Sequence, residues 1–175
     1  MIPVNQPLFI SKEEVYLRKC ITDGWTSSEG PFVKEFEERF ARFCGRKYGV
    51  AVSSGTAALE VAMGVLGLRP GDEVIMPTFT IISCPLAVIQ YGLVPVFVDA
   101  NPATWTIDTE KIEEKITSKT KAIMPVHIYG HPCDMDPIFR IAKKYNLKVI
   151  EDAAEAHGAE YRGARCGSFG DVSCF

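Results

Sequence analysis

The chain has 175 residues, of which 47% are hydrophobic and 23% charged, and its formal net charge is -3. These values are typical of one globular unit, and without a basic stripe they exclude a general nucleic-acid surface. No apolar run approaches the roughly 20 residues that a membrane helix needs, and the first residues lack the basic start and apolar middle of a signal peptide. We therefore expect a cytoplasmic protein with neither nucleic-acid nor membrane partners.

Residues 1–30 are expected to form an N-terminal arm and a first helix, after an extended start over residues 1–9. Ser11 and the charged turn that follows it indicate the helix start, and Asp23-Gly24 ends the helix. Its apolar side chains, Val15, Leu17 and Cys20, would face a core.

A second helix is predicted from Pro31 onward. Phe32, Phe36 and Phe40 recur at i, i+4 spacing, while charged residues take the other face. We expect these aromatic side chains to be core residues and not cofactor ligands.

A candidate anion site follows a strand expected over residues 48–52. Ser54, Gly55 and Thr56 lie in a small-residue loop that opens a strong helix. Free backbone N–H groups and the helix dipole favour a phosphate at such a point. An ordinary Ser/Thr helix cap would give the same pattern, so both interpretations stay open. No glycine-rich dinucleotide or P-loop motif is present.

Strands and helices then alternate along the chain. Strands are predicted over residues 73–77, 94–99, 121–126 and 148–152, and helices over 85–92, 108–116 and 136–146. This alternation predicts an α/β fold with a mostly parallel sheet covered on both faces. A hairpin tip is expected at residues 161–163 and a further strand from Asp171, inside which the chain stops, so we expect a longer parent protein.

The stretch from Lys148 to Ala159 carries the most informative acids. Glu151 and Asp152 come where a buried strand ends, which is where ligands bind in open α/β sheets. A carboxylate there could hold a cationic group of a cofactor. The alternative is that Asp152 caps a helix, with Glu155 completing a capping box, and the local pattern does not separate the two.

No metal site is expected. The six cysteines are scattered without a CxxC pair. The pair His127 and His131 has suitable spacing, but the glycine and proline around it indicate a turn and not a helix face.

Five segments taken together resemble the DegT-type nucleotide-sugar aminotransferases: SSGTAAL at 53–59, PTFT at 77–80, VHIYGHPCDMD at 126–136, EDAAEAHGA at 151–159 and GSFGDVSCF at 167–175. These are pyridoxal 5'-phosphate (PLP) enzymes of the aspartate-aminotransferase fold, PLP fold type I. The resemblance covers essentially the whole chain in order. It implies that residues 31–175 are an incomplete PLP-binding large domain and that the small C-terminal domain is absent.

By this resemblance, Ser54, Gly55 and Thr56 would hold the cofactor phosphate, and Asp152 would pair with the pyridine nitrogen and keep it protonated, so that the ring acts as an electron sink. Glu155 would lie near the ring hydroxyl or the substrate. The position that usually carries an aromatic stacking residue holds Ile81 or Ile82, with Phe79 as a candidate if the loop is shifted.

The motif at 151–159 has Glu155 where many relatives carry Gln, and in this it resembles the GDP-perosamine synthase subfamily. That similarity implies transfer of an amino group from glutamate to a nucleotide-linked 4-keto-6-deoxy sugar, in polysaccharide or O-antigen biosynthesis, by a homodimer when full length.

The resembled enzymes carry a Schiff-base Lys beyond the position where this chain stops, and none of its lysines lies in a matching motif. We therefore expect the 175 residues alone to be inactive. Two alternatives stay open: a PLP-dependent sugar dehydratase with His in place of that Lys, and a non-catalytic truncated paralogue that acts as a binding or pairing module.

Overall fold

The computed structural model describes residues 2, 3 and 6–175, and part of the extended start expected over residues 1–9 lies outside them. Its helices are α1 (Lys12–Thr22), α2 (Pro31–Phe43), α3 (Gly55–Val65), α4 (Ser83–Gln90) and α5 (Met135–Tyr145). Its strands are β1 (Glu73–Pro77), β2 (Val94–Val98), β3 (Thr120–Ile123), β4 (Lys148–Asp152), β5 (Glu160–Tyr161), β6 (Ala164–Arg165) and β7 (Val172–Cys174). Short 3-10 turns cover η1 (Thr109–Lys111), η2 (Glu113–Lys115) and η3 (Ile128–Gly130).

Five parallel strands form the central sheet, in the order β2-β1-β3-β4-β7, and β5 and β6 form the expected small hairpin. The predicted α/β fold with a mostly parallel sheet is confirmed. The helix expected over residues 108–116 is two separate 3-10 turns instead. Asp108 accepts a hydrogen bond from the Glu110 amide at the first of them, which favours a tight turn over a regular helix.

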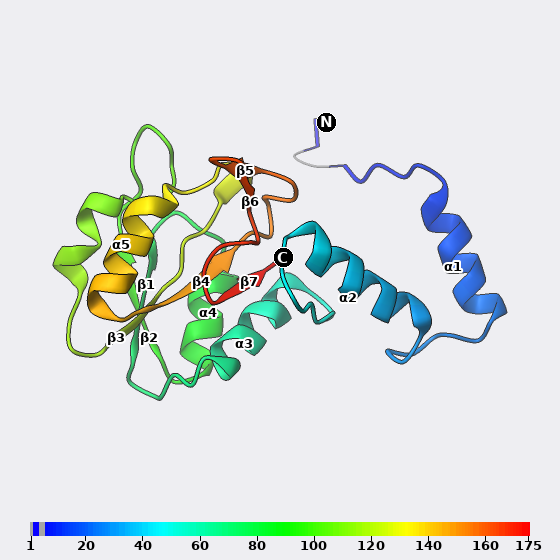
Figure 1. The fold of residues 1–175 in the computed structure, drawn as a ribbon, viewed down its shortest axis with the longest axis horizontal. Coiled ribbons are helices and arrows are strands. Elements are labelled where there is room, and N and C mark those ends of the chain that lie inside the picture. The colour runs from blue at the N-terminus through cyan, green and yellow to red at the C-terminus, as the bar shows by residue number, and fades with distance from the viewer. Residues whose placement is uncertain (1, 4–5) are drawn as a thin grey trace.

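Successive strand residues point to opposite sides, so both faces of the sheet carry apolar side chains. Helices cover both of these faces. Val74, Met76 and Ile150 pack against α3 and α4 in one core. Ile75, Val149 and their neighbours pack against α5 in a second core. Figure 1 shows α3 and α4 on one side of the sheet and α5 on the other. The ends of β1, β3 and β4 therefore lie between two packed layers.

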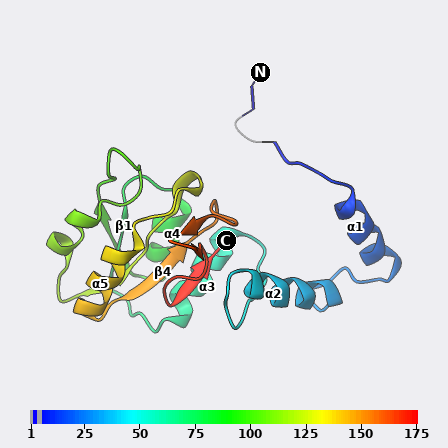
Figure 2. The same ribbon diagram turned by 45° about the horizontal axis from the view of Figure 1, so that its top comes forward.

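The N-terminal part differs from the prediction in its burial. Helices α1 and α2 form where expected, but none of the described α1 residues is buried, and Val15 and Leu17 are exposed. Phe36 is also exposed, which corrects its assignment to the core. Figures 1 and 2 show α1 standing apart from the α/β body and α2 reaching it only at one end. Helical periodicity identifies an apolar face but not what covers it.

The strand predicted over residues 48–52 is absent. Tyr48 and Val50 are exposed, and the Ala51 amide donates to the Glu37 carboxylate of α2, 2.8 Å away, instead of joining a ladder. A β-branched run forms a strand only where a neighbouring strand offers its backbone. No described strand lies beside residues 48–52.

None of the described helices is long and apolar enough to cross a bilayer.

Gly170 lies in the turn before β7, which packs closely against β4. A substitution at Gly170 tests this packing. Its φ is +71°, and an added Cβ would lie 2.6 Å from the Val149 carbonyl oxygen. We expect Gly170→Ala to lower the free energy of unfolding by about 3 kcal/mol, from strain plus overlap. The matched control is Gly163→Ala, which has a φ of +81° but nothing within 4 Å, and should cost only about 1 kcal/mol. Equal losses in chemical denaturation would contradict the steric part.

Candidate functional site

The two acids at the end of β4 point to opposite faces of the sheet, as adjacent strand residues must. Asp152 shares its side with Ile150 and faces α4, whereas Glu151 shares its side with Val149. Both are almost fully buried, at 4% and 0% exposure. The pair that looks like one feature in the sequence is therefore two separate sites.

Asp152 is held through both carboxylate oxygens by neutral donors. The Cys84 thiol, in the first turn of α4, donates to Oδ2 at 3.0 Å, and the Ala154 amide donates to Oδ1 at 3.1 Å. The backbone is fixed as well, because the Asp152 amide donates to Pro125 and its carbonyl accepts from His127. The carboxylate thus has a defined position at the carboxyl end of an interior strand.

The charge of Asp152 has no cationic partner in the described part of the chain. In this region, Arg46 forms its ion pair with Glu151, and His127 also hydrogen-bonds to Glu151. A buried carboxylate normally needs a cation, because neutral hydrogen bonds compensate only part of its desolvation. A cationic ligand group would therefore complete the partners of this carboxylate.

The interpretation of Asp152 as a helix cap is wrong. Residues 153–159 form turns, with the Ala156 amide bonded to the Ala153 carbonyl. Glu155 accepts from the Tyr129 amide instead of completing a capping box. Its carboxylate thereby holds the turn that follows β3, in which Tyr129 adopts a φ of +50°.

The start of α3 lies beside this site. Ser54 caps the helix, since its Oγ accepts from the Ala57 amide at 3.2 Å. The amides of Gly55 and Thr56 precede the intrahelical ladder, and within the described residues they have no protein partner. A Cβ built on Gly55 would lie 3.9 Å from that of Ala154, two residues after Asp152. The cap and the anion site are therefore compatible at this helix start.

Thr56 connects α3 to α4, and Cys84 of α4 connects that helix to Asp152. The Thr56 hydroxyl donates to Ser83 Oγ at 3.0 Å, and the adjacent Cys84 contacts Asp152. The fold thus brings together the helix start at residues 54–56 and the acid at residue 152, which are about 100 residues apart in sequence. Ile81 lies three residues before Cys84, just ahead of α4, and is 57% exposed.

Phe79 lies in an aromatic cluster. Its ring centroid is 5.3 Å from that of Trp105 and 6.2 Å from that of Tyr129. It also packs against the core formed with α3 and α4. These contacts give Phe79 a structural role in the packing of this region.

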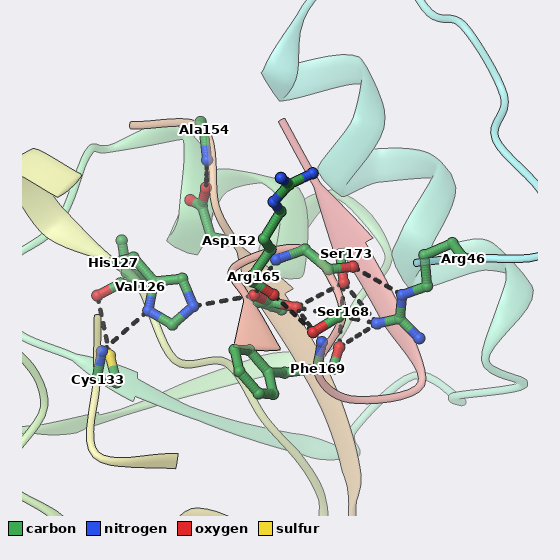
Figure 3. Close-up of polar contacts among 12 residues, drawn as sticks. Arg46, Val126, His127, Cys133, Asp152, Ala154, Arg165, Ser168, Phe169 and Ser173 are labelled. Carbon is green, nitrogen blue, oxygen red and sulfur yellow. Dashed lines mark hydrogen bonds and ion pairs between the residues drawn. The ribbon is translucent and has the colours of Figure 1, made fainter. Parts of the chain in front are cut away.

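Glu151 is the centre of a buried hydrogen-bond network. Its carboxylate accepts from the Phe169 amide at 2.9 Å and the Ser173 hydroxyl at 2.7 Å, and also from the Gly167 amide. Glu151 thus accepts from backbone amides of this loop, and Arg46 binds its carbonyl groups. The Arg46 guanidinium donates to the carbonyls of residues 167, 169 and 170. Figure 3 shows Arg46 and His127 on opposite sides of this network.

His127 completes the network and is not free to bind a metal. Its Nδ1 accepts from the Cys133 amide at 3.0 Å, so Nε2 carries the proton and donates to Glu151 at 3.0 Å. Ligand atoms of His127, Glu151 and Cys166 lie within 4.8 Å of one another. Because the first two are already satisfied by hydrogen bonds, this group is structural. His131 is exposed and is not a member of this group.

Sequence reasoning missed Arg46, Cys84 and the network role of His127. Each acts through a contact more than 20 residues away in sequence. No local pattern marks such residues, because their partners are set by strand order and helix packing.

Comparison with known proteins shows what this chain resembles. The model of the DegT/DnrJ/EryC1/StrS aminotransferase family matches residues 9–175. The chain belongs to this family. It is 49% identical over 174 residues to a GDP-perosamine synthase of Escherichia coli O157:H7, covering 99% of this chain and 48% of the relative. It is 50% identical over 159 residues to a dTDP-3-amino-3,6-dideoxy-alpha-D-galactopyranose transaminase of Aneurinibacillus thermoaerophilus, covering 91% and 44%.

Solved structures of the family agree. An aminotransferase from Psychrobacter cryohalolentis matches with a TM-score of 0.90 and 40% identity, over 97% of this chain and 43% of that one. A Streptococcus pneumoniae protein described as a sugar aminotransferase, solved in its PLP form, matches with a TM-score of 0.91 and 33% identity, over 98% and 47%. The resemblance and the aminotransferase fold predicted from the motifs are confirmed. The chain spans about half the length of these relatives.

The family's cofactor, PLP, fits the residues present. Its cationic ring nitrogen matches the unpaired charge of Asp152, and its phosphate matches the free amides at the start of α3. The two features are connected through α4, because Thr56 bonds to Ser83 and the adjacent Cys84 bonds to Asp152.

The Glu151 network generates a stability prediction. Glu151→Gln replaces one acceptor oxygen by an NH₂ group that faces existing donors and removes the charge opposite Arg46. We expect the free energy of unfolding to fall by about 3 kcal/mol, measured by chemical denaturation. The control Glu160→Gln removes an exposed acid 3.8 Å from Arg165 and should change little. Similar small changes in both variants would contradict the central role of Glu151.

Proposed function

We propose that this chain is the PLP-binding part of an aminotransferase that acts on nucleotide-linked sugars. The observation that carries the proposal is the buried carboxylate of Asp152, which pairs with no cationic side chain of the described residues and lies beside the amides that open α3. Family membership and the PLP-form neighbour support it.

Asp152 would accept a hydrogen bond from the protonated ring nitrogen and keep that proton in place. Ser54, Gly55 and Thr56 would bind the phosphate through backbone amides and the hydroxyl of Thr56. Ile81 would cover one face of the ring with an aliphatic surface where an aromatic residue is usual. Glu155 would orient the turn at Tyr129 and lie near the ring hydroxyl or the substrate. When bound, PLP supplies an electron sink for amino-group transfer.

The proposed reaction moves an amino group from glutamate to a nucleotide-linked 4-keto-6-deoxy sugar, as in GDP-perosamine synthesis. Three relatives with that name, 43% to 49% identical over nearly the whole chain, support this choice. Other relatives are named for dTDP- and UDP-linked sugars, so the test below includes all three nucleotides. The relatives reported above are named as synthases or transaminases, which supports transamination over the dehydratase alternative.

Several expectations stay predictions: the homodimer, the cytoplasmic location, the domain boundary at residue 30, the inactivity of the 175 residues alone and the non-catalytic module. A mixture of glutamate with GDP-, dTDP- or UDP-linked 4-keto sugars, analysed by mass spectrometry for the amino sugar, tests the reaction on the complete product of the native gene. Formation of a dehydrated sugar in place of the amine would favour the dehydratase.

Cofactor binding tests the role of Asp152 in the same protein. We expect Asp152→Asn to weaken PLP binding by about 10- to 100-fold, because a charged hydrogen bond to the ring nitrogen is lost, as measured by absorbance titration. The matched control is Asp99→Asn, which alters an exposed acid just after the edge strand β2 of the same sheet and should bind PLP normally. Unchanged binding by Asp152→Asn would remove the basis of the proposal.

A further inference from the structure

The Cys84 thiol occupies the contact between α4 and the end of β4. It is fully buried, and its Sγ lies 3.0 Å from Asp152 Oδ2 and 3.1 Å from Thr80 Oγ1. No other side chain in the described residues forms a hydrogen bond with the Asp152 carboxylate. The thiol is therefore the one side-chain support of the acid.

The direction of these hydrogen bonds follows from the groups involved. A carboxylate only accepts, so the single proton of the thiol points to Asp152, and the Thr80 hydroxyl donates to the sulfur. Burial, followed by the negative charge of Asp152 and the hydrogen bond to it, raises the pKa of Cys84 far above its usual range. The sulfur therefore keeps its proton and does not compete with Asp152 for a cation.

The thiol and the Ala154 amide act on different oxygens, and together they fix the plane of the carboxylate. Each oxygen has two lone pairs, so each keeps one for a ligand. A thiol is a weak donor, so it orients the acid and leaves most of the negative charge available to a cation.

We propose that Cys84 is a positioning residue for Asp152, and that its thiol holds the carboxylate in the orientation that meets the ring nitrogen of the cofactor. This inference rests on the proposed function. It adds a residue of α4 to the site, with Thr80 behind it as the donor that orients the sulfur. Cys84 itself touches neither ring nor substrate.

The test measures PLP affinity and the pH midpoint of the absorbance change of the bound cofactor, in the complete product of the native gene. We expect Cys84→Ala to raise the PLP dissociation constant about five- to tenfold, the effect of one lost hydrogen bond, and to shift the pH midpoint. Cys84→Ser should restore both to within about twofold, because its hydroxyl also donates. Thr80→Val keeps the thiol and should change affinity by about twofold.

Cys174→Ala is the matched control. Cys174 is a buried cysteine of the same core, at 3% exposure, whose thiol makes no hydrogen bond to Asp152 in the described residues. It should leave the pH midpoint unchanged. Equal effects in Cys84→Ala and Cys174→Ala, or no restoration by serine, would overturn the role of Cys84. If Cys84→Ala does not fold, the other two variants serve as the test. Cys84→Ser must then stay within about twofold of the wild type, and Thr80→Val must change the PLP affinity by about twofold.

The two proposals fail in different ways. A wild-type protein that binds no PLP, or an Asp152→Asn variant that binds it normally, overturns the proposed function together with this inference. If Asp152→Asn weakens PLP binding as expected but every Cys84 variant behaves like the wild type, only the positioning role of Cys84 is overturned.

Discussion

The buried carboxylate of Glu151 is the interaction on which the geometry of the site depends. It joins three segments that are distant in sequence: the end of β4, the loop at residues 167–170 and His127 after β3. Arg46 neutralises part of its charge and binds the carbonyls of the same loop. Because every acceptor position of this acid is used, the strand end that carries Asp152 cannot shift without leaving a buried charge unsatisfied.

Two neighbouring acids therefore have different physical environments on one strand. Glu151 receives an ion pair and several hydrogen bonds, whereas the described residues give the Asp152 carboxylate only a thiol and an amide as donors. The difference follows from strand alternation, which directs one side chain toward Arg46 and the other toward α4. The protein supplies a full set of partners to the first acid and leaves the second with capacity for a cation. This contrast is what makes Asp152 the centre of the proposed cofactor site.

Burial was the least predictable property of the helices. The apolar spacing in α1 and α2 predicted both helices, because periodicity depends only on local geometry. It did not predict that Val15 and Phe36 are exposed, since burial depends on which surface lies opposite. The run at residues 48–52 shows the same limit for strands, because its β-branched residues have no described strand beside them and Ala51 bonds to α2 instead.

The sequence by itself determined the alternation of strands and helices, the small-residue start of α3, the acid at the end of β4 and, through the order of its motifs, the family. These features are local, so composition and spacing carry them. Only the tertiary structure decided that Asp152 is not a helix cap, that Glu151 belongs to Arg46 and His127, and that Cys84 supports the proposed cofactor acid. Such contacts arise from strand order and helix packing across the sheet, which no short stretch of sequence encodes.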